Sequence, residues 1–300
     1  MPTKPVTKAV IAAAGFGTRF LPQTKAMPKE MLPLIDKPII QYVVEELVEA
    51  GIKDIIIVTG YSKRSIEDHF DIPSEDLLVN LRMGGKKKEP LLREIEAIAN
   101  LANFVYVRQK GPYGNATPIR NAAHLIGNEP FIYTYADEVF TASPGRTRQL
   151  IEAYNEHEAS VFACRRVESE EDYFRYGFVG GEPLKDNLIS VDHIIEKPGK
   201  NHQPNDLASV SGYLLLPEIF EYIENTNAVL NEVGEFWVQP IMQRMMDDGH
   251  KFVGCEITNG MYHDTGNKLE YLKTVVQFAL EHDELGKDFR DFLKTIDLTK

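Results

Sequence analysis

The sequence lacks the excess of basic residues that non-specific binding to nucleic acid requires. Its 300 residues include 33 Lys and Arg against 45 Asp and Glu, which gives a formal net charge of −12. We therefore expect no nucleic-acid partner. A small anionic ligand is not excluded, because a local cluster of cations can bind an anion against an overall negative field.

Long apolar runs are also missing. No stretch approaches the roughly 20 apolar residues that span a bilayer, and the N-terminus has no apolar segment of the signal-peptide type. These features predict a cytoplasmic protein with no membrane partner. The composition, 43% apolar and 26% charged, is typical of a soluble globular protein with a sizeable core.

Cysteine and tryptophan are scarce, with two Cys and one Trp in the whole chain. Cys164 and Cys255 lie in the apolar runs VFACRRV and FVGCEI. A chain of this length can build its core without a covalent staple, so we expect two buried thiols and no disulfide.

Strand-like and helix-like segments alternate through the first half of the chain. Residues 8–14, 54–60, 103–109 and 130–140 have the pattern of buried strands, and residues 38–52, 62–70, 90–99 and 117–126 have that of helices. The basic stretch GGKKKEP at 84–90 indicates a solvated loop. This order predicts an α/β fold, with a mostly parallel, Rossmann-like sheet and helices on both faces.

The second half contains strands that follow one another too closely for helical crossovers. They lie at 158–167, 176–181, 189–198 and 208–217, and helices are expected near 217–224, 235–248, 266–284 and 286–295. We therefore expect a mixed, antiparallel extension of the same sheet, followed by C-terminal helices. The chain shows no linker or internal repeat, so residues 1–300 are predicted to form one domain.

The stretch IAAAGFGTR leaves a buried strand through Gly15 and Gly17 and is followed by Arg19, Lys25 and Lys29. Glycines let the backbone approach a bulky ligand, and nearby cations neutralise phosphate charge. The alternative is a plain tight turn. A P-loop is excluded because no Lys-Ser/Thr follows the second glycine, and the dinucleotide fingerprint would require a third glycine at position 20.

Two carboxylates are candidates for a metal site. Asp137 lies at the end of a predicted strand, and Asp264 precedes a predicted helix. Together with a phosphate-binding loop they suit Mg²⁺, which takes few protein oxygens and completes its shell with phosphate and water. The alternative for Asp264 is a helix N-cap. His263 does not indicate zinc, because no second His or Cys stands at ligand spacing.

Residues 12–52, AAAGFGTRFLPQTKAMPKEMLPLIDKPIIQYVVEELVEAGI, closely resemble the N-terminal signature of sugar-1-phosphate nucleotidyltransferases. Within that superfamily the chain is most similar to the bacterial UTP–glucose-1-phosphate uridylyltransferases, also called UDP-glucose pyrophosphorylases. The resemblance continues through IVTGYSKRSIEDHF, YGFV, IIEKP, HDTGNKLEYLKT and LGKDFRDFL, so that it spans nearly the whole chain.

The resemblance implies a Mg²⁺-dependent transfer of a uridylyl group from UTP to glucose 1-phosphate, with UDP-glucose and pyrophosphate as products. It implies a nucleotide-binding half at 1–140, a sugar-binding half at 141–265 and C-terminal helices at 266–300. Nucleotide contacts are expected from Ala13, Ala14, Gly15, Gly17, Thr18, Glu30, Gln109 and Gly114. Catalytic cations are expected at Arg19, Lys25, Lys29 and Lys197.

On the sugar side the resemblance implies contacts from Gly177, Glu196, Ser211, Glu235 and Trp237, and it assigns Mg²⁺ to Asp137 and Asp264. The residues alone leave plainer alternatives open: a surface ion pair for Glu196 and Lys197, and helix packing for Trp237. A homo-oligomer, dimer or tetramer, is also implied. An apolar stripe on the predicted C-terminal helix agrees with it, formed by Leu269, Leu272, Val276, Phe278 and Leu280.

Several positions depart from the family pattern. The loop after Gln109 is short and has Asn115 where the family has His, and Tyr135-Ala136 precede Asp137 where Leu-Pro or Leu-Gly is usual. The family segment Gly-Arg-Tyr is Ser211-Gly212-Tyr213. In the segment after Glu235, the family residues Gln, Thr and Asp are replaced by Trp237, Gln239 and Pro240. These changes leave open which sugar and which nucleobase are used.

Three alternatives therefore accompany the leading prediction. The first is a nucleotidyltransferase of the same fold that uses another sugar 1-phosphate or another nucleotide. The second is a non-catalytic regulatory protein that binds nucleotide sugars; it is disfavoured because the charged residues expected in the site are all retained. The third is an NAD-dependent oxidoreductase, which the missing third glycine disfavours.

Overall fold

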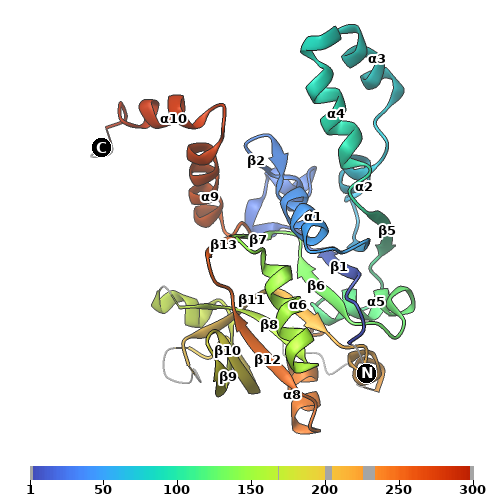
Figure 1. Ribbon diagram of the computed structural model, residues 1–300, viewed down its shortest axis with the longest axis vertical. Coiled ribbons are helices and arrows are strands. Elements are labelled where there is room, and N and C mark those ends of the chain that lie inside the picture. The colour runs from blue at the N-terminus through green and yellow to red at the C-terminus, as the bar shows by residue number, and fades with distance from the viewer. Residues whose placement is uncertain (1–2, 168, 200–204, 226–233, 298–300) are drawn as a thin grey trace.

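A mixed sheet crosses the molecule in the computed structural model, which describes residues 3–167, 169–199, 205–225 and 234–297 (Figure 1). Its strand order is β5-β4-β1-β6-β11-β8-β12-β10-β9. The strands of the first half are β1 (Lys8–Ala13), β4 (Asp54–Thr59), β5 (Asn103–Arg108) and β6 (Phe131–Tyr135). Those of the second half are β8 (Ser160–Arg166), β9 (Gly177–Lys185), β10 (Leu188–Glu196), β11 (Leu207–Leu215) and β12 (Phe252–Glu256).

The four strands of the first half are parallel to one another, as predicted, and β1 pairs with both β4 and β6. Alternate residues of these strands enter two different cores. In β1, Ala9 and Ile11 belong to one apolar cluster and Val10 to the other, and β4 divides in the same way. A strand buried on both faces needs helices on both sides of the sheet, which confirms the predicted arrangement of layers.

Eight of the described helices match predicted segments in order, and two, at 75–83 and 146–157, were not predicted. In the first half they are α1 (Ile39–Glu49), α2 (Arg64–Phe70), α3 (Glu75–Met83), α4 (Glu89–Ile98) and α5 (Ala116–Ile126). In the second half they are α6 (Arg146–His157), α7 (Ile219–Asn225), α8 (Gln239–Asp247), α9 (Lys268–Glu281) and α10 (Gly286–Leu293). Helix α1 begins directly after Pro38 and buries one face of Ile40, Val43, Val44 and Leu47.

The second half extends the sheet with mixed directions, as expected. β11 is antiparallel to β6, β8 and β9, and β10 is antiparallel to β9 and β12. Two strands were not predicted: β12, which is parallel to β8, and β13 (Gly260–Asp264). Gly254 interrupts the apolar run of β12, and β13, with the sequence GMYHD, shows no apolar alternation, so neither has a distinctive strand pattern.

The strand predicted over 130–140 is in fact two strands. β6 ends at Tyr135, the chain turns at Ala136 and Asp137, and β7 (Glu138–Ala142) leaves the main sheet to pair with β13. The turn is fixed by Thr265, whose backbone N–H and hydroxyl both donate to the carbonyl of Asp137. Asp137 therefore follows the strand end at a corner of the chain.

Helix α3 was also not predicted. Ser74 caps its N-terminus by accepting from the N–H of Leu77, and Leu78 and Leu81 are buried. Of the stretch predicted as a loop, residues 84–88 form the turn between α3 and α4, where a short 3₁₀ helix spans Gly85–Lys87, whereas Glu89 and Pro90 begin α4. The α3–α4 hairpin and the α9–α10 pair project from the body of the molecule as two helical arms (Figure 1).

Cys164 on β8 and Cys255 on β12 are buried free thiols, which confirms the prediction for both. No helix in the described ranges is long and apolar enough to cross a membrane. Two further short strands, β2 (Pro33–Leu34) and β3 (Lys37–Pro38), form a small antiparallel pair before α1.

Candidate active site

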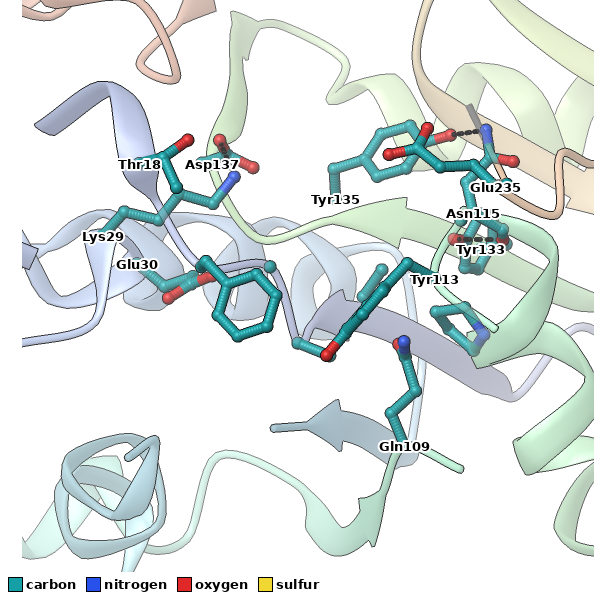
Figure 2. A pocket seen from close by; sticks show the side chains of 17 residues that line it. Thr18, Lys29, Glu30, Gln109, Tyr113, Asn115, Tyr133, Tyr135, Asp137 and Glu235 are labelled. Carbon is teal, nitrogen blue, oxygen red and sulfur yellow. Dashed lines mark hydrogen bonds and ion pairs between the residues drawn. The ribbon is translucent and has the colours of Figure 1, made fainter. Parts of the chain in front are cut away.

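A cleft of about 420 Å³ opens at the carboxyl ends of β1, β5 and β6, where parallel α/β sheets place their ligands. Figure 2 shows Lys29 and Asp137 at one end of this cleft, and Asn115, Tyr135 and Glu235 at the other. Of the predicted site residues, the following line it: Ala14, Gly15, Thr18, Lys29, Glu30, Gln109, Gly114, Asp137 and Glu235.

Two residues expected at the nucleotide do not line this cleft. The side chain of Ala13 is buried in the core cluster beneath the sheet, while Ala12 and Ala14 line the cleft. The alternation of side chains along β1 explains this difference. Gly17 has φ +65°, and a Cβ there would lie 3.2 Å from both Lys29 and Thr24. Gly17 therefore lets the turn pack closely against Lys29.

Lys29 and Asp137 form an ion pair within the cleft, with Nζ 2.5 Å from Oδ2. Burial alone would lower the pKa of Lys29, but the negative charges of Asp137, Glu30 and Glu138 outweigh this effect and raise it. The ammonium therefore stays protonated. It is a fixed positive charge at the point where the glycine turn meets the end of β6.

Asp264 reaches the same place from the far end of the chain. It is the last residue of β13, directly opposite Glu138 of β7. Its Oδ2 accepts from Arg175 at 2.5 Å and from the hydroxyl of Tyr176 at 3.1 Å, while its Oδ1 accepts from the N–H of Gly266 at 3.1 Å. The alternative reading as a helix cap is wrong, because Asn267 caps α9 instead.

Gly266 separates the two carboxylates. A Cβ on Gly266 would lie 2.8 Å from Asp137 Oδ2, 3.2 Å from Asp264 Oδ1 and 3.7 Å from a guanidinium nitrogen of Arg19. The two acidic side chains thus face one small space that only a residue without a side chain leaves open. This donor set, two carboxylates beside a glycine turn and the Lys29 ammonium, fits a hard divalent cation.

The other predicted cations are spread around this centre. Arg19 is exposed and donates to the carbonyl of Gly266 at 3.3 Å, which places it beside the carboxylates. Lys25 lies instead in a neighbouring hollow of about 320 Å³, which shares only Phe16 and Thr18 with the main cleft. Lys25 is the last residue of the 3₁₀ helix Gln23–Lys25 and, unlike Lys29, does not line the main cleft.

Glu30 is fully buried and bonds to Lys63, with Lys63 Nζ 2.6 Å from Glu30 Oε2. Its other oxygen, Oε1, has no hydrogen-bond partner. The pair holds the first turn of α2 against the floor of the cleft. Lys63 is not among the predicted site residues, because a lysine in the polar run GYSKR carries no sign of burial.

Two aromatic rings meet over the mouth of the cleft. Phe16 of the glycine turn and Tyr113 of the loop after β5 are in edge contact, with ring centroids 5.2 Å apart, and both line the cleft. They are 60% and 57% exposed. Exposed aromatic rings at a cleft mouth can cover a flat ligand group, and neither residue is among those predicted from the sequence.

Among the residues predicted to contact the sugar, Glu196 ends β10 opposite Gly177 of β9. A Cβ on Gly177 would lie 2.8 Å from Glu196 Oε2, so the glycine leaves the room that this carboxylate occupies. Burial raises the pKa of Glu196, and the positive charge of Lys197 opposes that rise. Lys197 has φ +49° and its Nζ lies 3.8 Å from Glu196 Oε1.

Trp237 lies just before α8, which begins later than predicted. Its indole N–H donates to Glu235 at 2.9 Å, and Lys197 Nζ lies 5.8 Å from the centre of its ring. Trp237 therefore joins the predicted sugar-side residues instead of packing within a helix.

Ser211 is placed differently from the other sugar-side residues. It is buried, with φ +60°, and its hydroxyl bonds to Arg146 and to the carbonyl of Glu138. The Arg146 guanidinium also pairs with Glu46 at 2.7 Å. Ser211 is thus part of a buried polar cluster that joins α1, α6 and β11, and it does not face the cleft.

The two halves of the chain meet at Gly114. This glycine has φ +126°, and a Cβ would lie 2.1 Å from the carbonyl oxygen of Phe236. Backbone hydrogen bonds run from Phe236 N–H to the Tyr113 carbonyl and from Ala116 N–H to the Phe236 carbonyl. The loop after β5 is therefore bonded directly to the segment that carries Glu235 and Trp237.

Residues 8–280 match the family model described as nucleotidyl transferase. This chain belongs to the nucleotidyl transferase family. It is 41% identical over 291 residues to a UTP–glucose-1-phosphate uridylyltransferase of Staphylococcus saprophyticus, which covers 97% of this chain and 99% of that protein. It is also 41% identical to the UTP–glucose-1-phosphate uridylyltransferase of Bacillus subtilis, covering 97% of each chain.

Solved structures agree with this assignment. A UTP-bound UDP-glucose pyrophosphorylase of Acinetobacter baumannii superimposes with a TM-score of 0.88 at 33% identity and covers 98% of this chain and all of that one. A UDP-glucose pyrophosphorylase complexed with UDP-glucose gives a TM-score of 0.82 at 34% identity, covering 93% of this chain and all of that one. The predicted α/β fold is therefore confirmed.

Nucleotidyl transferases of this family generally require a divalent metal ion. In the described part of this nucleotidyl transferase, no group of three or more His, Cys, Asp or Glu side chains is arranged to hold one. Two carboxylates whose remaining ligands come from phosphate and water satisfy both observations. His263 does not contribute, because its two ring nitrogens lie at the hydroxyls of Thr141 and Thr274.

Proposed function

We propose that this nucleotidyl transferase moves a uridylyl group from UTP to glucose 1-phosphate and forms UDP-glucose and pyrophosphate. The proposal is carried by one observation: full-length similarity to UTP–glucose-1-phosphate uridylyltransferases coincides with a cleft to which both halves of the chain contribute. We assign residues 1–140 to nucleotide binding, 141–265 to sugar binding and 266–300 to the C-terminal helices, of which 298–300 lie outside the described residues.

The chemistry requires charge neutralisation and no general base. An oxygen of the sugar phosphate attacks the α-phosphorus of UTP, the new P–O bond forms, and the bond to the β-phosphate breaks with its electron pair leaving on pyrophosphate. Two unit charges about 4 Å apart repel by roughly 4 kcal/mol at an effective dielectric near 20. Fixed cations that cancel such repulsion in the transition state accelerate the reaction.

The positions of the cations suggest separate roles. Lys29 lies inside the cleft and would meet the triphosphate, and Arg19 beside Gly266 would approach the same group. Lys197 next to Glu196 would hold the phosphate of the sugar. Lys25, in the neighbouring hollow, would act on the outer side of the glycine turn.

We assign the metal ion as Mg²⁺ and its protein ligands as Asp137 and Asp264. When bound, it would supply positive charge to the phosphates at the point of transfer. Lys29 and Arg175, which pair with these carboxylates, would balance their charge from the opposite sides. Gly266 would keep the space between the two carboxylates open.

Base and sugar are proposed to bind at opposite ends of the cleft. Gln109 and the Gly114 loop would face the uracil, with Phe16 and Tyr113 covering it. Glu196 would accept from sugar hydroxyls, with Trp237 and Glu235 as the adjacent wall. Ser211, being buried, would act only through its cluster with Arg146.

We further propose a cytoplasmic location, since two free buried thiols suit a reducing compartment. A homo-oligomer is proposed from α9, where Leu269 and Leu272 are each 59% exposed and Val276 lies on the same helix. Exposed apolar side chains repeated along a helix mark an interaction surface.

A screen of pyrophosphate release tests the proposal. The protein is incubated with Mg²⁺, with each of five nucleoside triphosphates and with a panel of sugar 1-phosphates. We expect the fastest release with UTP and glucose 1-phosphate, and UDP-glucose as the product. Fast turnover of another pair would show that the chain catalyses a different nucleotidyl transfer. No turnover with any pair would favour the alternative of a non-catalytic regulatory protein that binds nucleotide sugars.

A further inference from the structure

Four side chains form a continuous hydrogen-bonded row between the nucleotide loop and the sugar side. Asn115 Nδ2 donates to the hydroxyl of Tyr135 at 3.1 Å and to Gln239 Oε1 at 3.2 Å. Gln239 Nε2 then donates to Glu196 Oε2 at 3.3 Å. Three of the four, Asn115, Tyr135 and Gln239, are positions at which the sequence departs from the family pattern.

The row has a fixed direction. The backbone N–H of Val238 donates to Asn115 Oδ1 at 2.8 Å, and a backbone N–H cannot act as an acceptor. Asn115 must therefore turn its NH₂ group toward Gln239. Gln239 in turn must accept with Oε1 and point its own NH₂ group at Glu196. A single backbone donor thus sets the orientation of both amides.

Glu196 needs such support. Gly177 opposite it offers space and no side chain, and Lys197 Nζ at 3.8 Å is beyond hydrogen-bond distance. In the described part of the chain, Gln239 is the only hydrogen-bond donor that reaches this carboxylate. It engages Oε2, so Oε1 is the oxygen that a ligand hydroxyl can approach.

We propose that Gln239 is a positioning residue that holds the Glu196 carboxylate in the orientation required by a sugar hydroxyl, and that Asn115 sets the direction of the Gln239 amide. This inference rests on the proposed function, because it assigns Glu196 to the sugar. It also explains why the loop at 109–115 and the start of α8 differ from the family pattern together: their side chains bond to each other.

The test separates the sugar from the nucleotide by comparing the affinities for UDP-glucose and UDP, measured by isothermal titration calorimetry. The ratio of the dissociation constant for UDP to the dissociation constant for UDP-glucose reports the contribution of the glucose moiety alone. Gln239→Leu should reduce this ratio about tenfold, as expected for a lost hydrogen bond to a charged group. The affinity for UDP itself should stay within about twofold.

A double-mutant cycle shows whether Gln239 acts through Glu196. In the Glu196→Gln background, adding Gln239→Leu should change the ratio by less than about twofold, because the carboxylate that Gln239 positions is gone. Asn115→Asp should reduce the ratio in the parent protein, since a carboxylate there turns the Gln239 carbonyl toward Glu196. It should have no such effect when Gln239 is already Leu.

Gln243→Leu is the matched control. Gln243 lies one turn further along α8 and also attaches the helix to β10, through the N–H of Ile194 and the carbonyl of Asp192. If Gln239 only fastened the helix to the strand, both variants would reduce the ratio equally. We expect Gln243→Leu to lower the melting temperature and to leave the ratio unchanged.

The outcomes are distinguishable. If the parent protein forms no UDP-glucose from UTP and glucose 1-phosphate, the proposed function is wrong and this inference falls with it. If the parent protein is active but Gln239→Leu reduces the ratio equally with and without Glu196, or does not reduce it, only the positioning role of Gln239 is overturned.

Discussion

Lys29 Nζ and Asp137 Oδ2 lie 2.5 Å apart, although the two residues are more than a hundred positions apart in the sequence. The contact joins the cation assigned to the triphosphate to a carboxylate assigned to the metal ion. The negative charge of Asp137 helps to raise the pKa of Lys29 against the effect of burial, so the ammonium depends on this carboxylate. Replacing either residue changes the electrostatics of both.

Replacement of Lys29 or Lys197 by Ala should lower kcat/KM by about two to four orders of magnitude, as loss of a charge that stabilises the transition state does. Steady-state pyrophosphate release measures the effect. Lys53→Ala, at an exposed lysine before β4, is the matched control and should behave like the parent protein. Near-parental turnover of either site variant at saturating Mg²⁺ would show that the replaced lysine has no role in catalysis.

Chelation by EDTA should abolish activity, and added Mg²⁺ should restore it. Asp137→Asn and Asp264→Asn should each raise the Mg²⁺ concentration needed for half-maximal activity, because each removes one of two anionic ligands. The control is Glu45→Gln, a carboxylate on α1 that bonds to Lys37. Full activity in chelator, or an unchanged Mg²⁺ dependence for Asp264→Asn, would contradict the paired-carboxylate assignment.

Much of the fold followed from local patterns. The apolar runs before Gly15 and around Ile56 predicted buried parallel strands, and the periodic stretch after Pro38 predicted α1. The position of Ala13 could also have been inferred, because side chains alternate along a strand. The break after Tyr135 could not, because Thr265, which fixes that turn, lies far away in the sequence.

The site, like the fold, contains some residues that the sequence predicts and others that it does not. Motif residues such as Lys29, Asp137 and Glu196 could be named from the sequence. Their partners could not: Arg175 at Asp264 and Lys63 at Glu30 are ordinary basic residues in polar runs, and only the folded chain brings them to a carboxylate. The family resemblance assigned Lys25 to the same site as Lys29, but Lys25 lines the neighbouring hollow and not the main cleft.

Lys63→Met should destabilise the protein by about 3–5 kcal/mol, the usual cost of leaving one partner of a buried ion pair without its counter-charge. Both members of this pair are buried, Glu30 completely. Guanidinium denaturation measures the loss. The double variant Glu30→Gln with Lys63→Met should recover a large part of it, since no uncompensated charge remains. Equal losses in both variants would show that the charge pair is not the cause.

The apolar stripe on α9 should mediate self-association. The structure places Leu269, Leu272 and Val276 on the surface, whereas Phe278 packs against Tyr42. Light scattering at micromolar concentration should give a multiple of 34.0 kDa, and Leu272→Glu should shift it toward the monomer. Lys273→Glu, an exposed change on the same helix, controls for charge. A parent protein that measures as a monomer would refute the proposed oligomer.

The raised pKa of Glu196 makes sugar binding dependent on pH. Burial disfavours the ionised form of Glu196, and Lys197 only partly offsets this effect. As the pH falls, Glu196 should therefore become protonated at a pH above 4.5, the ordinary pKa of a glutamic acid side chain. A protonated carboxyl is a poorer acceptor for sugar hydroxyls, and the ratio of UDP to UDP-glucose dissociation constants should decrease through that pH range.

Because the pKa of Glu196 is raised on folding, the stability that Glu196 contributes is present at low pH and is lost as the pH rises through the folded-state pKa. Glu196→Gln should therefore raise the melting temperature relative to the parent protein more at pH 7 than at pH 4, and its affinity ratio should not change with pH. A ratio that varies with pH equally in the parent protein and in Glu196→Gln would assign the titration to another group.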